Sequence, residues 1–364
     1  MSGLAAFVRR DFLSLYEEAR KIQRQFLKHN LPIDIVDYDE YRRLRFPPYL
    51  PSRLRGEWMR RHGVKEYRRA IFWFPYQRLE LAKVLEAARK VGAEKAIFYT
   101  VTEGIAKHIN LLARRLRDEY VVTPSKFSKE MIERTGLRVR EVIPHQLEEP
   151  LEIDHEFGRR WRAKYPRNKK LLVYIGNPVR RKGLPELREA VEILSRRRRD
   201  FLVIVHTIDQ PRLAGYSVKQ LRHEHLVVEE EFGKITKPQA LAKVFYSDFY
   251  VHPAKGEGFG LPVLEALQMG RPLICVNAPG VNEIASPQNS FMVERVEMGE
   301  EDYPPGGMSL IKFVVANYDP KDLAEKMDEA LSAPREVLED KIARGYEAVA
   351  RFRNAYDRFV ELLG

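Results

Sequence analysis

The feature that most constrains the fold of this chain is an alternation of strand-like and helix-like runs, which occurs in two separate blocks. In the second block, residues 171–176 and 201–206 are almost wholly apolar. Strands of this composition are buried on both faces, as in a parallel sheet covered by helices on both sides. The alternation therefore predicts an α/β protein with two doubly wound parallel-sheet domains.

The first block predicts a domain over residues 1–150. Its apolar positions 12, 15, 19, 22 and 26 recur at helical spacing, which predicts a helix over 11–28. Because the chain begins almost directly with this helix, we expect the first strand to be missing or reduced to residues 1–4. Further strands are predicted at 31–37, 69–74, 94–101, 120–125 and 139–144, and helices at 79–91 and, capped by Ser125 or Ser128, through residue 134.

The second block predicts a domain over residues 151–334, and a helical segment at 335–364 follows it. A charged stretch without strand-like runs, residues 147–168, is predicted to be the linker. The predicted strands are 171–176, 201–206, 226–228, 249–252 and 272–276, and the predicted helices are 185–196, 238–246 and 261–269. Ligands of such sheets bind beyond the carboxyl ends of the strands.

Composition narrows the class of protein. A length of 364 residues suits two domains, and 44% hydrophobic residues exclude wholesale disorder. The one cysteine, Cys275, excludes an intramolecular disulfide and a cysteine-built metal site. The chain has no apolar run of about 18 residues and no signal-peptide layout at its start, so we expect a soluble cytoplasmic protein.

The net charge of +11 suits an anionic partner, which could be nucleic acid, a membrane surface or a phosphorylated substrate. Proteins of thermophiles that are rich in Lys, Arg and Glu also have such compositions. Residues 41–69 interleave nine arginines with aromatic residues, as a membrane interface, a lipid-linked acceptor or single-stranded nucleic acid would require. The alternative is a solvated basic surface over aromatic residues that belong to the core.

A glycine-rich turn, residues 252–265, lies between a predicted buried strand and a predicted helix. Glycine at 256, 258 and 260 lets backbone N–H groups approach a ligand closely. The following helix offers its positive N-terminal end to an anion. Glu257 and Glu265 flank this turn, and carboxylates suit the paired hydroxyls of a ribose or a sugar.

Two other interpretations of the turn are open. A dinucleotide-binding turn would have an acidic residue at the end of the next strand, where this chain has Asn277. A plain tight turn with solvated glutamates would need no ligand.

Residues 257–266 read Glu-Gly-Phe-Gly-Leu-Pro-Val-Leu-Glu-Ala, and this segment resembles the signature of retaining glycosyltransferases of the family-four type. The resemblance extends to Gly176 with Lys182-Gly183, to residues 270–284 and to the segment that ends at His145, and it is specific over about residues 120–285. It implies the GT-B fold, in which two Rossmann-like domains face each other across a cleft and the last helix commonly crosses back to the N-terminal domain.

The resemblance also implies the roles of the site residues. Glu265 would bind the ribose diol of a nucleotide sugar, Glu257 would hold the donor sugar, and Lys182 would neutralise the diphosphate. The family usually has arginine where this chain has Asn177, so Arg180 or Arg181 is expected to supply that charge. The remaining donor-binding residues are expected to be Gly176, Gly258, Phe259 and Gly260.

Three further expectations follow from the resemblance. Glu103 stands where the family's acceptor-side His-Asp is usual, and we assign it that role. Gln146 replaces a glycine at the end of the N-terminal domain. Lysine and arginine do the work of a metal in this family, so no metal and no cofactor beyond the donor are expected.

Two clusters could bind a metal on paper. Residues 37–39 read Asp-Tyr-Asp, but this pair lies in the wrong domain for a donor site of this fold. Residues 223–225 read His-Glu-His, but they lack a third ligand and the His-Glu-x-x-His spacing, which favours a surface loop. His206, which ends a predicted strand, would either face the donor or form a structural hydrogen bond. Neither cluster changes the expectation that the protein has no metal site.

The sequence thus predicts a retaining hexosyltransferase that moves a sugar from a nucleotide-diphosphate donor to a hydroxyl acceptor. The acceptor is unknown and could be lipid-linked or held at an anionic membrane surface. The alternative is a degenerate GT-B protein that binds nucleic acid or an anionic surface without catalysis.

Overall fold

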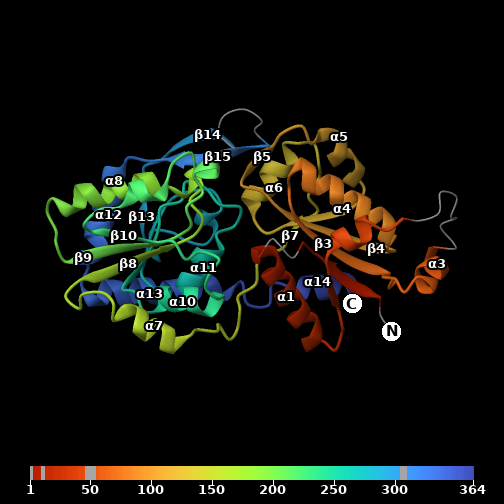
Figure 1. Ribbon diagram of the computed structural model, residues 1–364, viewed down its shortest axis with the longest axis horizontal. Helices are drawn as coiled ribbons and strands as arrows, with labels where there is room; N and C mark the ends of the chain where they lie inside the picture. Colours follow the sequence, from red (N-terminus) through yellow and green to blue (C-terminus); the bar gives the residue numbers. More distant parts are fainter. Residues whose placement is uncertain (1–2, 10–12, 46–54, 304–309) are drawn as a thin grey trace. The chain divides into compact units, whose positions relative to one another are not determined.

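The computed structural model describes residues 3–9, 13–45, 55–303 and 310–364. The chain divides into two compact units (Figure 1). The first contains Met1–Gln146 together with Asn354–Gly364, and the second contains Leu147–Arg353. Each unit has its own hydrophobic core around a six-stranded sheet.

The sheet of the first unit is wholly parallel in its described pairings, with the strand order β2-β1-β3-β4-β6-β7. Numbered along this sheet alone, the order is 2-1-3-4-5-6, which places a topological switch point between β1 and β3. The strands are β1 (Leu4–Phe7), β2 (Asp34–Val36), β3 (Arg69–Pro75), β4 (Lys95–Val101), β6 (Tyr120–Thr123) and β7 (Glu141–Val142).

The first strand, β1, corrects the expectation that this element is missing or reduced to residues 1–4. All four of its residues are buried, and Ala5 pairs with Asp34 of β2 on one side and Ala70 of β3 on the other. The strand is too short to show a clear apolar period in the sequence. Its small side chains fit a central position where helices cover both faces of the sheet.

The three predicted helices of the first unit are present, and short helices that were not predicted lie between them. Ser125 is the cap of α6, since its side chain accepts a hydrogen bond from the backbone N–H of Ser128 at 2.9 Å. The helical elements are α1 (Leu13–Lys28), α2 (Tyr38–Arg42), α3 (Arg55–Arg61), α4 (Arg78–Val91), α5 (Asn110–Ala113), η2 (Arg114–Leu116) and α6 (Lys126–Glu133), and the short strand β5 (Gly104–Ala106) follows β4.

The last helix, α14 (Asp357–Leu363), belongs to the first unit although it is far away in sequence. Tyr356 and Phe359 pack in the same core cluster as Leu4 of β1. The hydroxyl of Tyr356 also donates to the buried carboxylate of Glu18 on α1, and His145 Nδ1 lies 3.0 Å from that hydroxyl. The predicted helical segment over 335–364 is therefore two helices, of which α13 (Arg335–Ala350) stays in the second unit.

The sheet of the second unit is also parallel, with the strand order β10-β9-β8-β11-β12-β13. In chain order this is 3-2-1-4-5-6, the order of a dinucleotide-binding Rossmann sheet, and its switch point lies between β8 and β11. The strands are β8 (Lys170–Ile175), β9 (Phe201–His206), β10 (Leu226–Glu229), β11 (Phe249–His252), β12 (Leu273–Val276) and β13 (Ser290–Val293).

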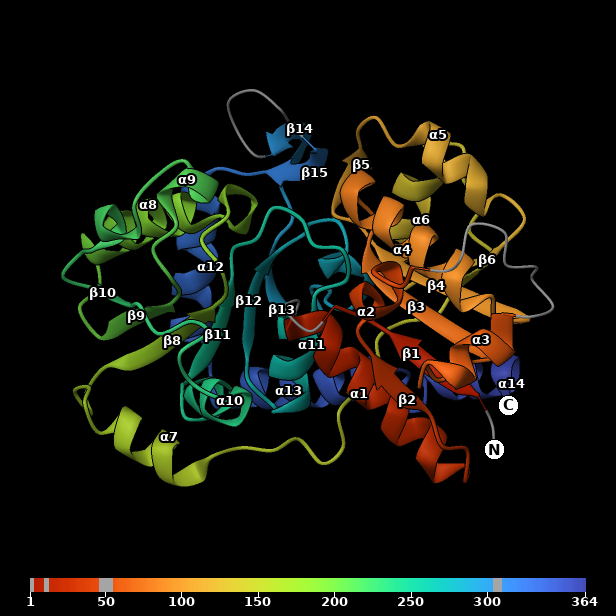
Figure 2. The same cartoon turned by 45° about the vertical axis from the view of Figure 1, so that its right-hand side comes forward.

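Helices cover both faces of this sheet (Figure 2). On one face α8 (Leu184–Ser195) packs against α12 (Pro320–Ser332), and on the other α11 (Leu261–Gln268) packs against α13. This layering explains why its strands are nearly continuous apolar runs. The other helical elements of this unit are α7 (His155–Arg162), η3 (Arg180–Lys182), α9 (Pro211–Ala214), η4 (Val218–Leu221), α10 (Lys237–Phe245) and η5 (Val281–Glu283).

Several elements of the second unit were not predicted, among them β13, α12, a helix in the linker and a hairpin. The helix α7 lies within the predicted linker and packs against α10, with Trp161 fully buried. An antiparallel hairpin, β14 (Glu297–Tyr303) and β15 (Ile311–Asn317), separates β13 from α12. Within the described residues, every helix is too short or too polar to cross a bilayer.

Candidate functional site

Three loops meet at the carboxyl edge of the second unit's sheet, beside its switch point. They follow β8, β11 and β12, which are neighbours in the sheet. The backbone N–H of Lys255 donates to the carbonyl of Arg181 at 2.7 Å, and that of Glu257 donates to the carbonyl of Pro279 at 3.0 Å. The glycine turn is thus bound by its backbone to the loops on both sides.

A buried carboxylate lies at the centre of these loops. Oε2 of Glu257 accepts from Nη1 of Arg181 at 2.9 Å, and Oε1 accepts from the ammonium of Lys182. Nε2 of His252 lies 3.2 Å from Oε1. Less than a tenth of the surface of Glu257, Arg181 and Lys182 is exposed. The three side chains therefore form a desolvated cluster of one anion and two cations.

The electrostatics of the cluster favour the ionised carboxylate. Burial by itself raises the pKa of Glu257, but Lys182 and Arg181 lower it more, so this pKa lies well below its ordinary value. Burial lowers the pKa of His252, Glu257 raises it, and the two cations lower it, so that the pKa lies below its ordinary value. At neutral pH the cluster therefore contains an anionic Glu257 and a neutral His252.

Glycines let the loops approach this closely. Gly183 has φ +68°, and a Cβ built on it would lie 2.1 Å from the carbonyl oxygen of Pro253. Gly280 has φ +75°, and its Cβ would lie 2.2 Å from the carbonyl oxygen of Glu257. Both positions combine a left-handed backbone with direct contact between backbones, so any side chain would move the loops apart.

The second predicted carboxylate, Glu265, lies in α11, which begins just after the glycine turn. Its Oε1 is 3.1 Å from the ammonium of Lys237, and this ammonium also lies 2.9 Å from Glu148. Burial raises the pKa of Tyr250 on β11, and the carboxylates of Glu265 and Glu257 both raise it further. The two glutamates therefore act on one buried phenol of β11.

Gly258, Phe259 and Gly260 complete the turn. Gly260 adopts φ +105° directly before α11. The ring of Phe259 is buried edge-on against Phe352 at 5.6 Å, so this side chain belongs to the core and only its backbone belongs to the turn.

The loop after β8 contains the other predicted donor-site residues. The hydroxyl of Tyr174 donates to the carbonyl of Asn177. Gly176 leaves room for this hydroxyl, because a Cβ added at Gly176 would lie 2.5 Å from it. Oδ1 of Asn177 is buried and has no hydrogen-bond partner among the described residues. Arg180 is exposed, whereas Arg181 is buried in the cluster, so it is Arg181 that brings guanidinium charge to Glu257.

Glu103 lies in the first unit, in the turn after β4 at the carboxyl edge of that sheet. The hydroxyl of Thr102 forms this turn by donating to the carbonyl of Gly104 at 2.7 Å. The assignment of Glu103 to the acceptor side stays a prediction.

A lysine lies among three possible metal ligands of the second unit. His206, Glu229 and Glu231 bring ligand atoms within 4.8 Å of one another. The buried ammonium of Lys243 donates to both carboxylates at 2.6 Å and lies 3.1 Å from His206 Nδ1. His206 thus forms a structural hydrogen bond, and an ammonium supplies the positive charge that a metal would bring.

The other acidic pair also has a structural role. Asp37 caps α2 by accepting from the backbone N–H of Asp39, which itself pairs with Arg42 at 2.8 Å.

The basic and aromatic segment over residues 41–69 is described in part. The side chains of Tyr41, Met59 and Tyr67 are buried, and Trp58 stacks on His62 at 4.0 Å. These side chains pack against other parts of the protein. This favours the interpretation of the segment as a solvated basic surface over aromatic residues of the core. Phe46 and Tyr49 lie outside the described residues.

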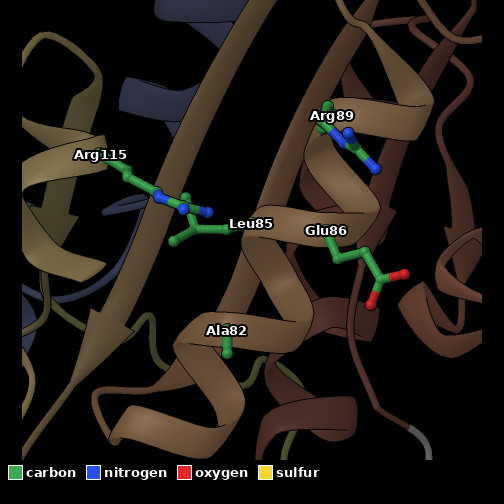
Figure 3. A pocket seen from close by; sticks show the side chains of 5 residues that line it. All are labelled: Ala82, Leu85, Glu86, Arg89 and Arg115. Atoms are coloured by element: carbon green, nitrogen blue, oxygen red, sulfur yellow. The ribbon is translucent and has the colours of Figure 1, made fainter. Parts of the chain in front are cut away.

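A separate depression lies on the surface of the first unit, between α4 and η2 (Figure 3). Arg115 extends from η2 toward Leu85 of α4, and Ala82, Glu86 and Arg89 complete the lining. Glu86 is paired with Lys90 at 3.1 Å. The charges here belong to the solvated face of a helix, and the depression contains none of the predicted site residues.

Sequence reasoning missed three residues that shape the site, His252, Lys255 and Lys237. His252 is the last residue of β11, and Lys255 is a lysine inside an otherwise apolar and glycine-rich segment. A charged residue at the carboxyl end of a buried strand was the available signal for both. Lys237 carries no such signal, because it follows an exposed loop.

Comparison with known proteins gives consistent matches. The family model for glycosyl transferases group 1 matches residues 158–348. A glycosyltransferase of Sulfolobus islandicus rod-shaped virus 1 is 22% identical over 307 residues, which is 82% of this chain and 88% of that protein. TuaC of Bacillus subtilis, named as a glycosyltransferase of teichuronic acid biosynthesis, is 30% identical over 37% of this chain and 32% of its own length.

Solved structures share the fold over the full length of the chain. A glycosyltransferase from Rickettsia africae superposes with a TM-score of 0.68 at 14% identity, covering 100% of this chain and 97% of that one. HepE from Anabaena, solved in complex with UDP and glucose, superposes with a TM-score of 0.67 at 13% identity, covering 100% and 99%. The predicted GT-B class of fold is confirmed.

Proposed function

Since the chain belongs to the group 1 glycosyl transferases, we propose that it transfers a hexose from a nucleotide-diphosphate sugar to a hydroxyl acceptor, with retention of the anomeric configuration. The observation that carries this proposal is the buried cluster of Glu257, Arg181 and Lys182 at the switch point of the second unit's sheet. Open α/β sheets bind their ligands at that point.

The two cations would stabilise the leaving group. Breaking the bond between the sugar and the diphosphate leaves negative charge on the nucleoside diphosphate, and positive groups already in place lower the barrier to that step. Lys182 and Arg181 bring this charge, and the N-terminal end of α11 adds its partial positive charge. This arrangement supports catalysis without a metal ion.

Glu265 would bind the ribose through its vicinal hydroxyls. The ammonium of Lys237 lies 3.1 Å from this carboxylate and helps to fix its position. Glu257, with the backbone of Gly258, Phe259 and Gly260, would hold the hydroxyls of the donor sugar.

Glu257 is better suited to this positioning role than to nucleophilic attack. Its charge is shared with two cations, and its pKa is far below its ordinary value, so its nucleophilicity is low. This supports retention by attack of the acceptor on the face from which the diphosphate leaves, without a covalent adduct of Glu257.

The acceptor would bind through the first unit, where Glu103 would act on its hydroxyl. A lipid-linked acceptor at an anionic membrane surface would suit the net charge of +11. The UDP and glucose present in the HepE structure suggest a UDP-hexose as the first donor to test.

A thermal-shift screen of UDP-, GDP- and ADP-sugars tests the donor site, because a ligand that binds the native state raises Tm. We expect one nucleotide class to raise Tm saturably, the Glu265→Gln variant to weaken that effect, and turnover to survive EDTA. Steeply salt-dependent binding of nucleic acid with no donor affinity would instead favour the non-catalytic alternative.

A further inference from the structure

The β14–β15 hairpin packs against the loop that contains the two cations. Its residues Ile311, Phe313 and Val315 alternate along β15 and form a small apolar cluster with Val179, which lies two residues before Arg181. The ring of Phe313 lies 5.2 Å from the guanidinium carbon of Arg181, within the range of a cation–π contact. One face of the hairpin therefore covers the base of the cationic loop.

A buried lysine ties the same face to the glycine turn. The ammonium of Lys255 donates to Glu301 of β14 and lies 3.3 Å from Glu186 of α8. Only 4% of the Lys255 side chain is exposed. In the antiparallel register Glu301 lies opposite Phe313, so the ion pair and the cation–π contact share one face of the hairpin.

Backbone bonds complete the connection. The N–H of Lys255 donates to the carbonyl of Arg181, and the carbonyl of Lys255 accepts from the N–H of Ala316 on β15, both at 2.7 Å. The carbonyl oxygen of Val314 lies so close to Gly256 that an added Cβ would be 2.7 Å from it. Hairpin, glycine turn and cationic loop are thus joined in one layer.

Arg181 is held inside this layer by several rigid groups. Its Nη1 donates to the carbonyl of Gly256 at 2.7 Å and to Glu257 at 2.9 Å, and the Phe313 ring covers it. A planar guanidinium in such a setting has little freedom to reorient, whereas the ammonium of Lys182 ends a flexible stem of four carbons.

From this asymmetry we infer that the hairpin is a positioning element of the donor site. It fixes Arg181 as the lasting counter-ion of Glu257, so that Lys182 is the cation that moves to the donor diphosphate. Glu301, Lys255 and Phe313 are positioning residues, since they act through Arg181. This inference rests on the proposed function and adds a division of labour between the two cations.

Two neighbouring glutamates provide a matched test. Glu301→Gln removes the charge that holds Lys255, whereas Glu300→Gln removes the same charge from the other face of β14, where it pairs with Lys312 at 2.8 Å in solvent. We expect Glu301→Gln to raise the Kd of the nucleoside diphosphate and the donor KM about five- to tenfold with a smaller change in kcat. The Glu300→Gln variant should stay within about twofold of the wild type.

Phe313 provides a second pair. Phe313→Leu retains apolar packing but removes the ring over Arg181, and Phe313→Tyr retains the ring. We expect the first to weaken nucleotide binding and the second to restore it. The probes are UDP, GDP and ADP in calorimetry with the full chain, at a temperature where circular dichroism shows all variants to be folded.

Hydrogen exchange separates failure of this inference from failure of the proposed function. The amides of Lys255 and Ala316 should exchange at least about tenfold faster in Glu301→Gln than in Glu300→Gln, with or without nucleotide. If the wild type binds none of the three nucleotides, the proposed function fails and the exchange result alone decides the role of the hairpin. Equal exchange and equal nucleotide binding in the two glutamate variants would overturn the inference.

Discussion

The guanidinium of Arg181 and the carboxylate of Glu257 lie 2.9 Å apart, with 7% and 8% of their side chains exposed. Such a pair is costly to desolvate, and a hydrophobic pair of the same volume would often stabilise a fold at least as well. Its presence at the carboxyl edge of a Rossmann sheet therefore indicates a functional requirement.

Lys182→Met should lower kcat by about 10²- to 10³-fold, because it removes the cation that neutralises the leaving diphosphate. Steady-state kinetics with the donor found in the thermal-shift screen measures this. Lys326→Met in α12 is the control, since that lysine pairs with Glu329 on the surface. Turnover that is equal in the two variants would contradict the role of Lys182.

Glu265→Gln should raise the donor KM about tenfold and change kcat less, because the charged hydrogen bonds to the ribose weaken in ground and transition states alike. A donor that carries a 2′,3′-dideoxyribose should lose affinity for the wild type and be indifferent to the substitution. Equal loss of affinity for both donors would place Glu265 away from the ribose.

Gly280→Ala should destabilise the second unit by more than the roughly 1–2 kcal/mol that a left-handed backbone alone costs. The added methyl group would collide with the carbonyl of Glu257, whereas at Gly233, with φ +78°, it would meet nothing within 4 Å. Urea unfolding measures the free energy of unfolding of both variants. Gly280→Ala loses stability through the collision and the backbone strain, and Gly233→Ala loses it through the strain alone. Equal losses would show that the loops can move apart freely.

His206 should make stability depend on pH below neutrality. Burial and the nearby Lys243 lower its pKa from 6.5 to about 4, so the unfolded chain takes up a proton at a pH where the folded chain does not. Stability should therefore fall as the pH drops from about 6.5 to about 4, by up to roughly 3 kcal/mol, and this contribution should level off below that range. Thermal unfolding of the wild type and of His206→Gln at pH 7 and pH 4.5 measures it, and the variant should lose less Tm.

The long periodic elements could be predicted because their neighbours do not alter them. Strand 201–206 and helix 79–91 match β9 and α4 almost to the residue, since each is buried on the sides that its apolar pattern indicates. The glycine turn could be placed as well, because glycines that alternate between a strand and a helix have few structural meanings.

Two of the elements that were not predicted, β14 and α7, depend on contacts that are distant in sequence. Four of the seven residues of β14 are acidic, which is not typical of a strand. The strand is stabilised by pairing with β15 and by the ion pair between Glu301 and Lys255. The helix α7 has two large apolar residues in a charged segment, and its Trp161 finds a partner in Glu229 at 2.9 Å. No local pattern reports such partners.

The site could be predicted in composition but not in internal geometry. Glu257 and Lys182 were singled out separately, one for sugar hydroxyls and the other for phosphate. Their direct contact, and the choice of Arg181 over Arg180, depend on how the loops after β8 and β11 pack, which only Gly183 hints at in the sequence.

The return of α14 to the first unit has a consequence for biosynthesis. Tyr356, Phe359 and Leu363 line the same core as Leu4 and Ala6, although more than three hundred residues separate them along the chain. When residues 3–146 have been synthesised, the structure of the first unit is therefore still incomplete. Its apolar side chains lack the packing of α14, and the carboxylate of Glu18 lacks its hydrogen bond from Tyr356. The second unit can close while translation continues, whereas the first reaches its native form only after α14 has been made.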